Sequence, residues 1–106
     1  MAAGEDPVRF RFETTVIHWR GPSPFFYAPV PAELAGEVRA AAKAVSYGWG
    51  VVPAEAQVSG VTFTTSLFPK DGTYLVPLKD AVRKKAAVTA GDRVTVEMTL
   101  AAKRVG

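Results

Sequence analysis

The sequence contains no cysteine and only one histidine, His18. The chain therefore has no disulfide, no thiolate metal ligand and no cysteine nucleophile, which is typical of proteins from a reducing compartment. A metal site on His18 would need carboxylates for all its other ligands, and no cluster of Asp and Glu at ligand spacing accompanies it. We expect a cytoplasmic protein without a metal or a cofactor.

Long apolar segments are also missing. No apolar run approaches the roughly 20 residues that cross a bilayer, and the N-terminal residues have neither the basic nor the apolar region of a signal peptide. We therefore expect no export and no membrane partner. The 106 residues, 48% of them hydrophobic, suit one domain. We expect a single domain over residues 1–106, with flexible ends at about 1–6 and 102–106.

Recognisable catalytic patterns are absent as well. The sequence has no phosphate-binding loop and no dinucleotide fingerprint, and no serine lies in a nucleophile motif. Glu33 and Glu37 are four positions apart on an expected helix surface, where carboxylates are more often solvated than catalytic. The sequence thus favours a protein that is not an enzyme, and it assigns no catalytic residue.

Alternation of apolar and polar residues predicts a mainly β protein. In the last segment Val94, Val96, Met98 and Leu100 alternate with polar residues. The alternation changes phase near residues 15–17, which predicts a bulge inside the first strand. We expect strands over residues 8–20, 25–28, 51–59, 61–68, 73–76 and 93–100, with turns at 59–60 and 69–72 and with Pro77 ending the fifth strand.

Two segments have helical periodicity. Leu34, Val38 and Ala42 are four positions apart and line one helix face, after a proline that suits a helix start. This pattern predicts a helix over about residues 32–46. The same spacing recurs over about residues 78–87 and predicts a second helix.

Similar segments precede the two helices. Pro31 and Pro77 lie 46 positions apart before the helices, and Arg39 and Arg83 lie 44 positions apart within them. Each unit is a strand, a helix, a loop and a further strand, and neither unit can bury its apolar face alone. We expect the units to pair about a pseudo-twofold axis and to close one small barrel with a helix over each end. One chain can then supply both halves as a monomer.

A series of motifs covers nearly the whole chain. The second half contains Ser66-Leu67-Phe68-Pro69, Gly72, Tyr74-Leu75-Val76-Pro77-Leu78-Lys79, Val82-Arg83-Lys84 and Gly91-Asp92. The first half contains His18-Trp19, Gly21, Phe25-Phe26-Tyr27, Pro31 and Gly48-Trp49-Gly50. Together these motifs resemble the bacterial family called domain of unknown function 1905. The resemblance implies a double-split β-barrel, an architecture that AbrB-type transcription factors build from two chains.

Aromatic side chains beside turns are the candidate ligand-binding residues. A structural role competes with this interpretation, because aromatic residues at strand ends of a small barrel usually fill its core. Trp49 lies between two glycines, which leave its ring less shielded. Arg83 either contacts an anion or forms an internal salt bridge with Asp80 or Asp92, and we favour the salt bridge. The candidate set is Trp19, Tyr27, Trp49, Tyr74 and Arg83.

Basic residues make nucleic acid the alternative partner. The net charge is +3 and the isoelectric point is near 9.5, and basic residues concentrate on the second helix. Glu33 and Glu37 argue against this partner, because they lie on the first helix where a matching basic surface would be needed. Phosphate contacts would come from Arg39, Lys43, Lys79, Arg83, Lys84 and Lys85. The sequence therefore predicts a non-catalytic binding module for a small-molecule or protein ligand, with an AbrB-like, nucleic-acid-binding regulatory protein as the alternative.

Overall fold

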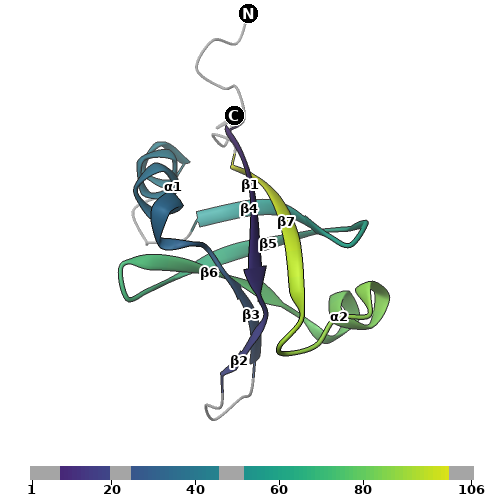
Figure 1. Ribbon diagram of the computed structural model, residues 1–106. Helices are drawn as coiled ribbons and strands as arrows, with labels where there is room; N and C mark the ends of the chain where they lie inside the picture. The colour runs from purple at the N-terminus through teal and green to yellow at the C-terminus, as the bar shows by residue number, and fades with distance from the viewer. Residues whose placement is uncertain (1–7, 20–24, 46–51, 101–106) are drawn as a thin grey trace, which may run out of the picture.

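Seven antiparallel strands form one curled sheet, and two helices lie against it in the computed structural model (Figure 1). The structure describes residues 8–19, 25–45 and 52–100, so the ends expected to be flexible lie outside the described residues. The prediction of a mainly β fold with two helices is confirmed. The elements are β1 (Val8–Thr15), β2 (Ile17–Trp19), β3 (Phe25–Pro29), α1 (Ala32–Val45), β4 (Val52–Val58), β5 (Val61–Lys70), β6 (Thr73–Leu78), α2 (Asp80–Ala86) and β7 (Arg93–Leu100).

The strands lie side by side in the order β1-β7-β4-β5-β6-β3-β2. The sheet has two halves, which we name after their central strand pairs. In the β4–β7 half, β7 lies between β1 and β4, and β4 also pairs with residues 61–67 of β5. In the β3–β6 half, β6 lies between residues 68–70 of β5 and β3, which also pairs with β2. Strand β5 therefore runs through both halves, and the segment formed by β1 and β2 does the same.

Val16 separates β1 from β2, within the region of residues 15–17 where the alternation changes phase. Its N–H donates to the carbonyl of Asp92 at 2.9 Å, and its carbonyl accepts from the N–H of Gly91 at 2.8 Å. These bonds hold the chain where it changes partner from β7 to β3. The single strand expected over residues 8–20 is therefore divided into two strands with different neighbours.

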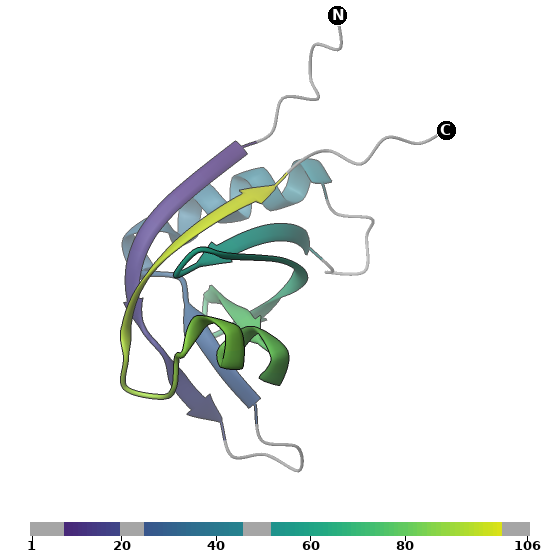
Figure 2. The same ribbon diagram turned by 90° about the vertical axis from the view of Figure 1, so that its right-hand side faces the viewer.

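The core lies on the inner side of the curled sheet. In β7 every second residue from Val94 to Leu100 is buried, as the sequence alternation predicts. The same core contains Phe12 of β1 and Val38 of α1. Helix α1 contacts β6, β4 and β7, whereas α2 contacts β5, and both ribbon views place the helices at opposite ends of the molecule (Figures 1 and 2). Neither described helix is long and apolar enough to cross a membrane.

Two-residue turns join β4 to β5 and β5 to β6. Ser59 and Gly60 have φ values of 49° and 81°, and Asp71 and Gly72 have values of 51° and 81°. Positive φ at both central positions is the mark of the type I′ turn, whose twist matches that of a hairpin. The turn predicted at residues 59–60 is confirmed.

Three prolines belong to strands, contrary to the sequence prediction. One is Pro29, which pairs with Leu75 at the end of β3. The turn expected over residues 69–72 is limited to its last two residues, because Pro69 pairs with β6. Pro77 does not end β6 but pairs with Tyr27 of β3. Strand β6 pairs with β5 only over residues 73–75. Proline is tolerated at position 77 because β6 has no strand partner on its β5 side there, so no backbone hydrogen bond to β5 is lost.

Helix α1 ends within one residue of the predicted boundary, but α2 is shorter than predicted. Leu78 still pairs with Phe26 in the β6–β3 ladder, so the helix begins at Asp80 rather than at residue 78. It ends where Ala87 adopts the left-handed conformation, with φ of 57°. The strand partner of Leu78, which local periodicity does not reveal, decides the start of this helix.

We expect Met98→Ala to lower the free energy of unfolding by about 2–5 kcal/mol. Met98 is 1% exposed and pairs with Ala56 of β4, a side chain too small to fill the space left behind. Glu97→Gln alters the neighbouring exposed residue and should cost less than about 1 kcal/mol. Urea denaturation followed by circular dichroism measures both, and equal losses would contradict the assigned faces of β7.

Candidate functional site

The outer side of the β3–β6 half carries exposed aromatic side chains. In β3, Ala28 is fully buried whereas Phe25 is exposed, so the odd-numbered residues of this strand face outward. Strand pairing places Ile17 beside Tyr27 and Trp19 beside Phe25 on this same side.

Phe68 joins this group from β5. Its ring centre lies 6.1 Å from that of Tyr27, and the two planes differ by 19°. The ring of Phe25 lies 6.2 Å from that of Tyr27. The Nζ atom of Lys70 lies 4.1 Å from the centre of the Trp19 ring, which is a cation–π contact. We call the set Ile17, Trp19, Phe25, Tyr27 and Phe68 the aromatic face.

The aromatic face is the largest grouping of exposed apolar side chains among the described residues. Ile17, Trp19, Phe25 and Phe68 have exposed fractions of 37%, 40%, 51% and 49%, and Val8 of β1 is the one other large hydrophobic residue exposed in this part of the chain. Exposed apolar side chains are normally scattered singly over a surface. Their concentration on one side of β2, β3 and β5 therefore marks a candidate binding surface.

The structure brings together only some of the ligand-binding residues proposed from the sequence. Trp19 and Tyr27 lie on the aromatic face, whereas Tyr74 is 8% exposed and belongs to the core. Trp49 lies outside the described residues. The sequence interpretation omitted Phe25 and Phe68, although the parity of Phe25 with Tyr27 could have indicated the first of them.

Arg83 lies against the inner side of the β2–β3 hairpin rather than on the aromatic face. Its guanidinium carbon is 3.7 Å from the centre of the Phe26 ring, and its Nη2 pairs with Asp80. The ring of His18 stacks on the same phenylalanine with a centre distance of 4.6 Å. The side chain of Arg83 is only 19% exposed. The internal salt bridge favoured from the sequence is therefore present, with Asp80 as the partner.

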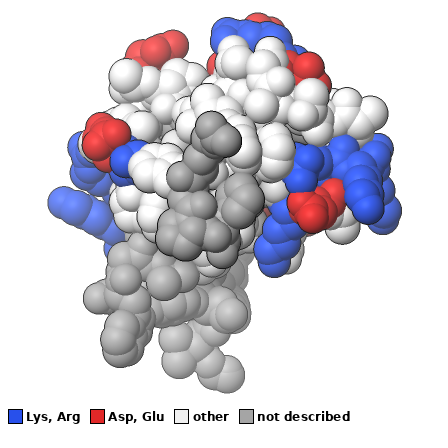
Figure 3. All heavy atoms as spheres, turned by 90° about the horizontal axis from the view of Figure 1, so that it is seen from below, with Lys and Arg blue, Asp and Glu red and all other residues white. Residues whose placement is uncertain are grey.

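The candidate phosphate contacts do not form one surface. Arg39 on α1 donates from Nη2 to the carbonyl of Gly72 at 2.7 Å. Lys79, Lys84 and Lys85 lie in or beside α2, where Figure 3 shows basic side chains gathered around an acidic one on the right of the view. Since α1 and α2 lie at opposite ends of the molecule (Figures 1 and 2), the six residues named from the sequence are divided between two places.

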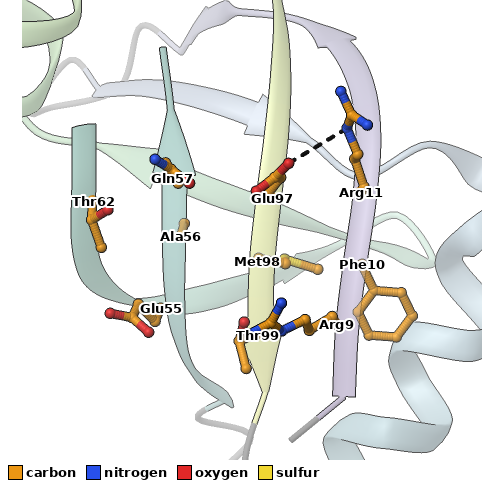
Figure 4. Close-up of a pocket in the computed structure, with 10 residues that line it drawn as sticks. All are labelled: Arg9, Phe10, Arg11, Glu55, Ala56, Gln57, Thr62, Glu97, Met98 and Thr99. Atoms are coloured by element: carbon orange, nitrogen blue, oxygen red, sulfur yellow. Dashed lines mark ion pairs between the residues drawn. The ribbon is translucent and has the colours of Figure 1, made fainter. Parts of the chain in front are cut away.

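A shallow polar hollow of about 430 Å³ lies on the outer side of the β4–β7 half (Figure 4). Strand register aligns its polar side chains in two rows across the sheet. The first row contains Arg9, Thr99 and Glu55, and the second contains Arg11, Glu97, Gln57 and Thr62. The Nε atom of Arg11 lies 3.5 Å from Oε2 of Glu97, and both side chains are more than half exposed. Water screens this pair, so its net contribution is small. Within the described ranges, no three His, Asp or Glu side chains gather closely enough to hold a metal ion.

These features define a small, mainly β protein with a curled antiparallel sheet, two helices and one exposed aromatic face. The chain belongs to the family described as "Domain of unknown function (DUF1905)", whose model matches residues 12–98. This match confirms the resemblance seen in the sequence motifs. No curated protein matches the chain.

We expect Arg83→Ala to lower the free energy of unfolding by about 1–2 kcal/mol, because it removes the contact with Phe26 as well as an ion pair. Asp80→Ala removes the ion pair alone and should cost less than about 1 kcal/mol, since Asp80 is largely exposed. Arg83→Lys keeps the charge but loses the planar stack, so it should resemble the alanine variant. Thermal and urea unfolding measure the losses, and a fully stable Arg83→Ala protein would show that the stack contributes nothing.

Proposed function

We propose that this protein is a non-catalytic binding module and that its ligand binds to the aromatic face. The grouping of four exposed large hydrophobic residues on one side of the β3–β6 half carries this proposal. Leaving such side chains in water gives up about 1.5–3 kcal/mol each relative to full burial. A ligand that covers the face recovers part of this free energy.

The position of the rings favours binding over a purely structural role. Tyr27 is half-buried, and its ring lies between those of Phe25 and Phe68, which restrict it before a ligand arrives. Aromatic side chains also have few rotatable bonds, which reduces the entropy lost when a ligand immobilises them. The polar hollow on the β4–β7 half has no comparable apolar anchor in its rows of charged and hydroxyl side chains.

We also propose that the curled sheet is a double-split barrel built from two related units, residues 8–58 and 61–100. The pairing scheme supports this proposal, because it is unchanged when the units are exchanged. In this exchange β1 and β2 together correspond to β5, β3 corresponds to β6, and β4 corresponds to β7. Pair β1–β7 then becomes β5–β4, and pair β2–β3 becomes β5–β6. Pairs β3–β6 and β4–β7 are unchanged. A single chain then supplies both halves, and the aromatic face stays accessible to a ligand.

A fragment screen by NMR tests the binding surface and does not require that the natural ligand be identified. We expect small aromatic fragments such as indole and phenol to shift the backbone amide signals of β2, β3 and residues 68–70 of β5, because preformed aromatic surfaces bind such probes. Phe68→Ser should abolish these shifts. Phe68 is about half exposed, so its replacement should leave the melting temperature within a few degrees of the unmodified protein.

Val8→Ser is the matched control for the fragment screen. It removes an equally exposed apolar side chain from β1, away from the aromatic face, and should leave all fragment shifts in place. Shifts that gather over the polar hollow instead, or the absence of shifts with every fragment, would refute the assignment of the aromatic face.

A further inference from the structure

We propose that the aromatic face binds single-stranded nucleic acid, with bases stacked on its rings and phosphates beside Lys70 and Lys79. The proposal rests on the aromatic face being the ligand surface and adds the chemical class of the ligand. It draws on the kind of side chain exposed, on the cations around the face and on the distribution of charge over the molecule.

The exposed side chains suit bases better than they suit aliphatic groups. Four of the five members of the face are aromatic, and they project from β2, from β3 and, across β6, from β5. The ring centres of Phe25, Tyr27 and Phe68 follow one another at 6.2 and 6.1 Å, a spacing that lets one extended strand contact several rings in turn. Every base has a flat π surface, so stacking on such rings needs no particular sequence.

Two lysines flank the aromatic face. The Nζ atom of Lys70 lies over the ring of Trp19, and the nearby carboxylate of Asp71, at 3.6 Å, is largely exposed and screened by water. Lys79 follows buried Leu78 and has an extended backbone. Continuing the β3–β6 register by one residue past Phe26 and Leu78 therefore places Lys79 across from Phe25, on the outer side. Among the described residues, Lys79 has no carboxylate within ion-pair distance.

Charge is distributed unevenly between the two sides of the molecule. On the β4–β7 half, Arg11 pairs with Glu97 and Arg93 pairs with Glu13. Basic residues are in excess elsewhere. The described residues of the β3–β6 half and α2 include Lys70, Lys79, Arg83, Lys84 and Lys85 against Asp71 and Asp80. The aromatic face therefore lies in the positive region, which attracts a polyanion.

The same geometry favours a single strand over a duplex. In a duplex the bases are stacked on each other and present no free faces to the rings. A duplex could therefore use only the cations, which are divided between the α1 end and the α2 end of the molecule (Figures 1 and 2). A single strand can use the rings and the flanking lysines together.

Fluorescence anisotropy tests the proposal with labelled oligomers of about 12 nucleotides, a length within the range that one small binding face occupies. The probes are oligo(dT), oligo(U) and a duplex of equal length, each at about 50 and about 200 mM salt. We expect both single strands to bind more tightly than the duplex, with an affinity that falls as salt rises. The ratio of the affinity for oligo(dT) to the affinity for oligo(U) shows whether DNA or RNA is the preferred strand.

Substitutions separate stacking from charge. Trp19→Ala and Phe68→Ala should each weaken oligo(dT) binding by about 10-fold, whereas Phe68→Trp keeps a ring and should retain the affinity. The double variant Lys70→Gln, Lys79→Gln should make the affinity less dependent on salt. Val8→Ser and Arg9→Gln on β1 are the matched controls and should change neither the affinity for oligo(dT) nor its salt dependence.

Three results would overturn the proposal. The first is tighter binding to the duplex, and the second is loss of binding on Lys84→Gln, Lys85→Gln while Trp19→Ala and Phe68→Ala bind normally. The third is the absence of binding at low salt. If small aromatic fragments still bind the aromatic face in that case, the face binds a protein or a small molecule instead; if they do not, the proposed function fails as well. Folding of Phe68→Ala and Phe68→Trp is checked by circular dichroism, and these two variants decide the outcome should Trp19→Ala not fold.

Discussion

The pair of backbone hydrogen bonds at Val16 fixes the path of the chain between the two halves of the sheet. Val16 is 1% exposed, so its N–H and carbonyl groups need protein partners, and the turn before β7 supplies them through Gly91 and Asp92. Held in this way, one continuous segment pairs with β7 on one side of Val16 and with β3 on the other. Strand β5 makes the corresponding change of partner between residues 67 and 68. The curl of the sheet follows from these two changes.

The aromatic face is a consequence of this arrangement. Beyond Val16 the short strand β2 has one neighbour, β3, and the β2–β3 pair is supported mainly from its inner side. On that side Phe26 packs against the edge of the core, and the side chains of His18 and Arg83 stack on its ring. No described element covers the outer side, so Trp19 and Phe25 remain in contact with solvent. The same hairpin thus combines a supported inner side with an accessible outer side.

Local patterns predicted what depends on local chemistry. The helix after Pro31, the Ser59-Gly60 turn and the alternation of β7 each follow from spacing or backbone preference within a few residues. Strand partners decided the rest. Pro77 looks like the end of a strand until its place on a partly free edge is known, and Tyr74 looks like a surface aromatic until its side of β6 is known. Phe68 is predicted as the last residue of its strand, before a turn, whereas the strand continues through Pro69 to Lys70.

Arg83 shows why the candidate site could be predicted only in part. The sequence favoured an internal salt bridge for this residue, and the pair with Asp80 is present, but local patterns gave no sign that its guanidinium stacks on Phe26. This contact joins α2 to the inner side of the strand that carries Phe25 and Tyr27 on its outer side. A preformed, rigid surface loses less entropy when it binds than one that must be ordered first. Arg83 therefore supports the hairpin from its inner side, while in the proposed complex the lysines at the edge of the aromatic face contact the phosphates.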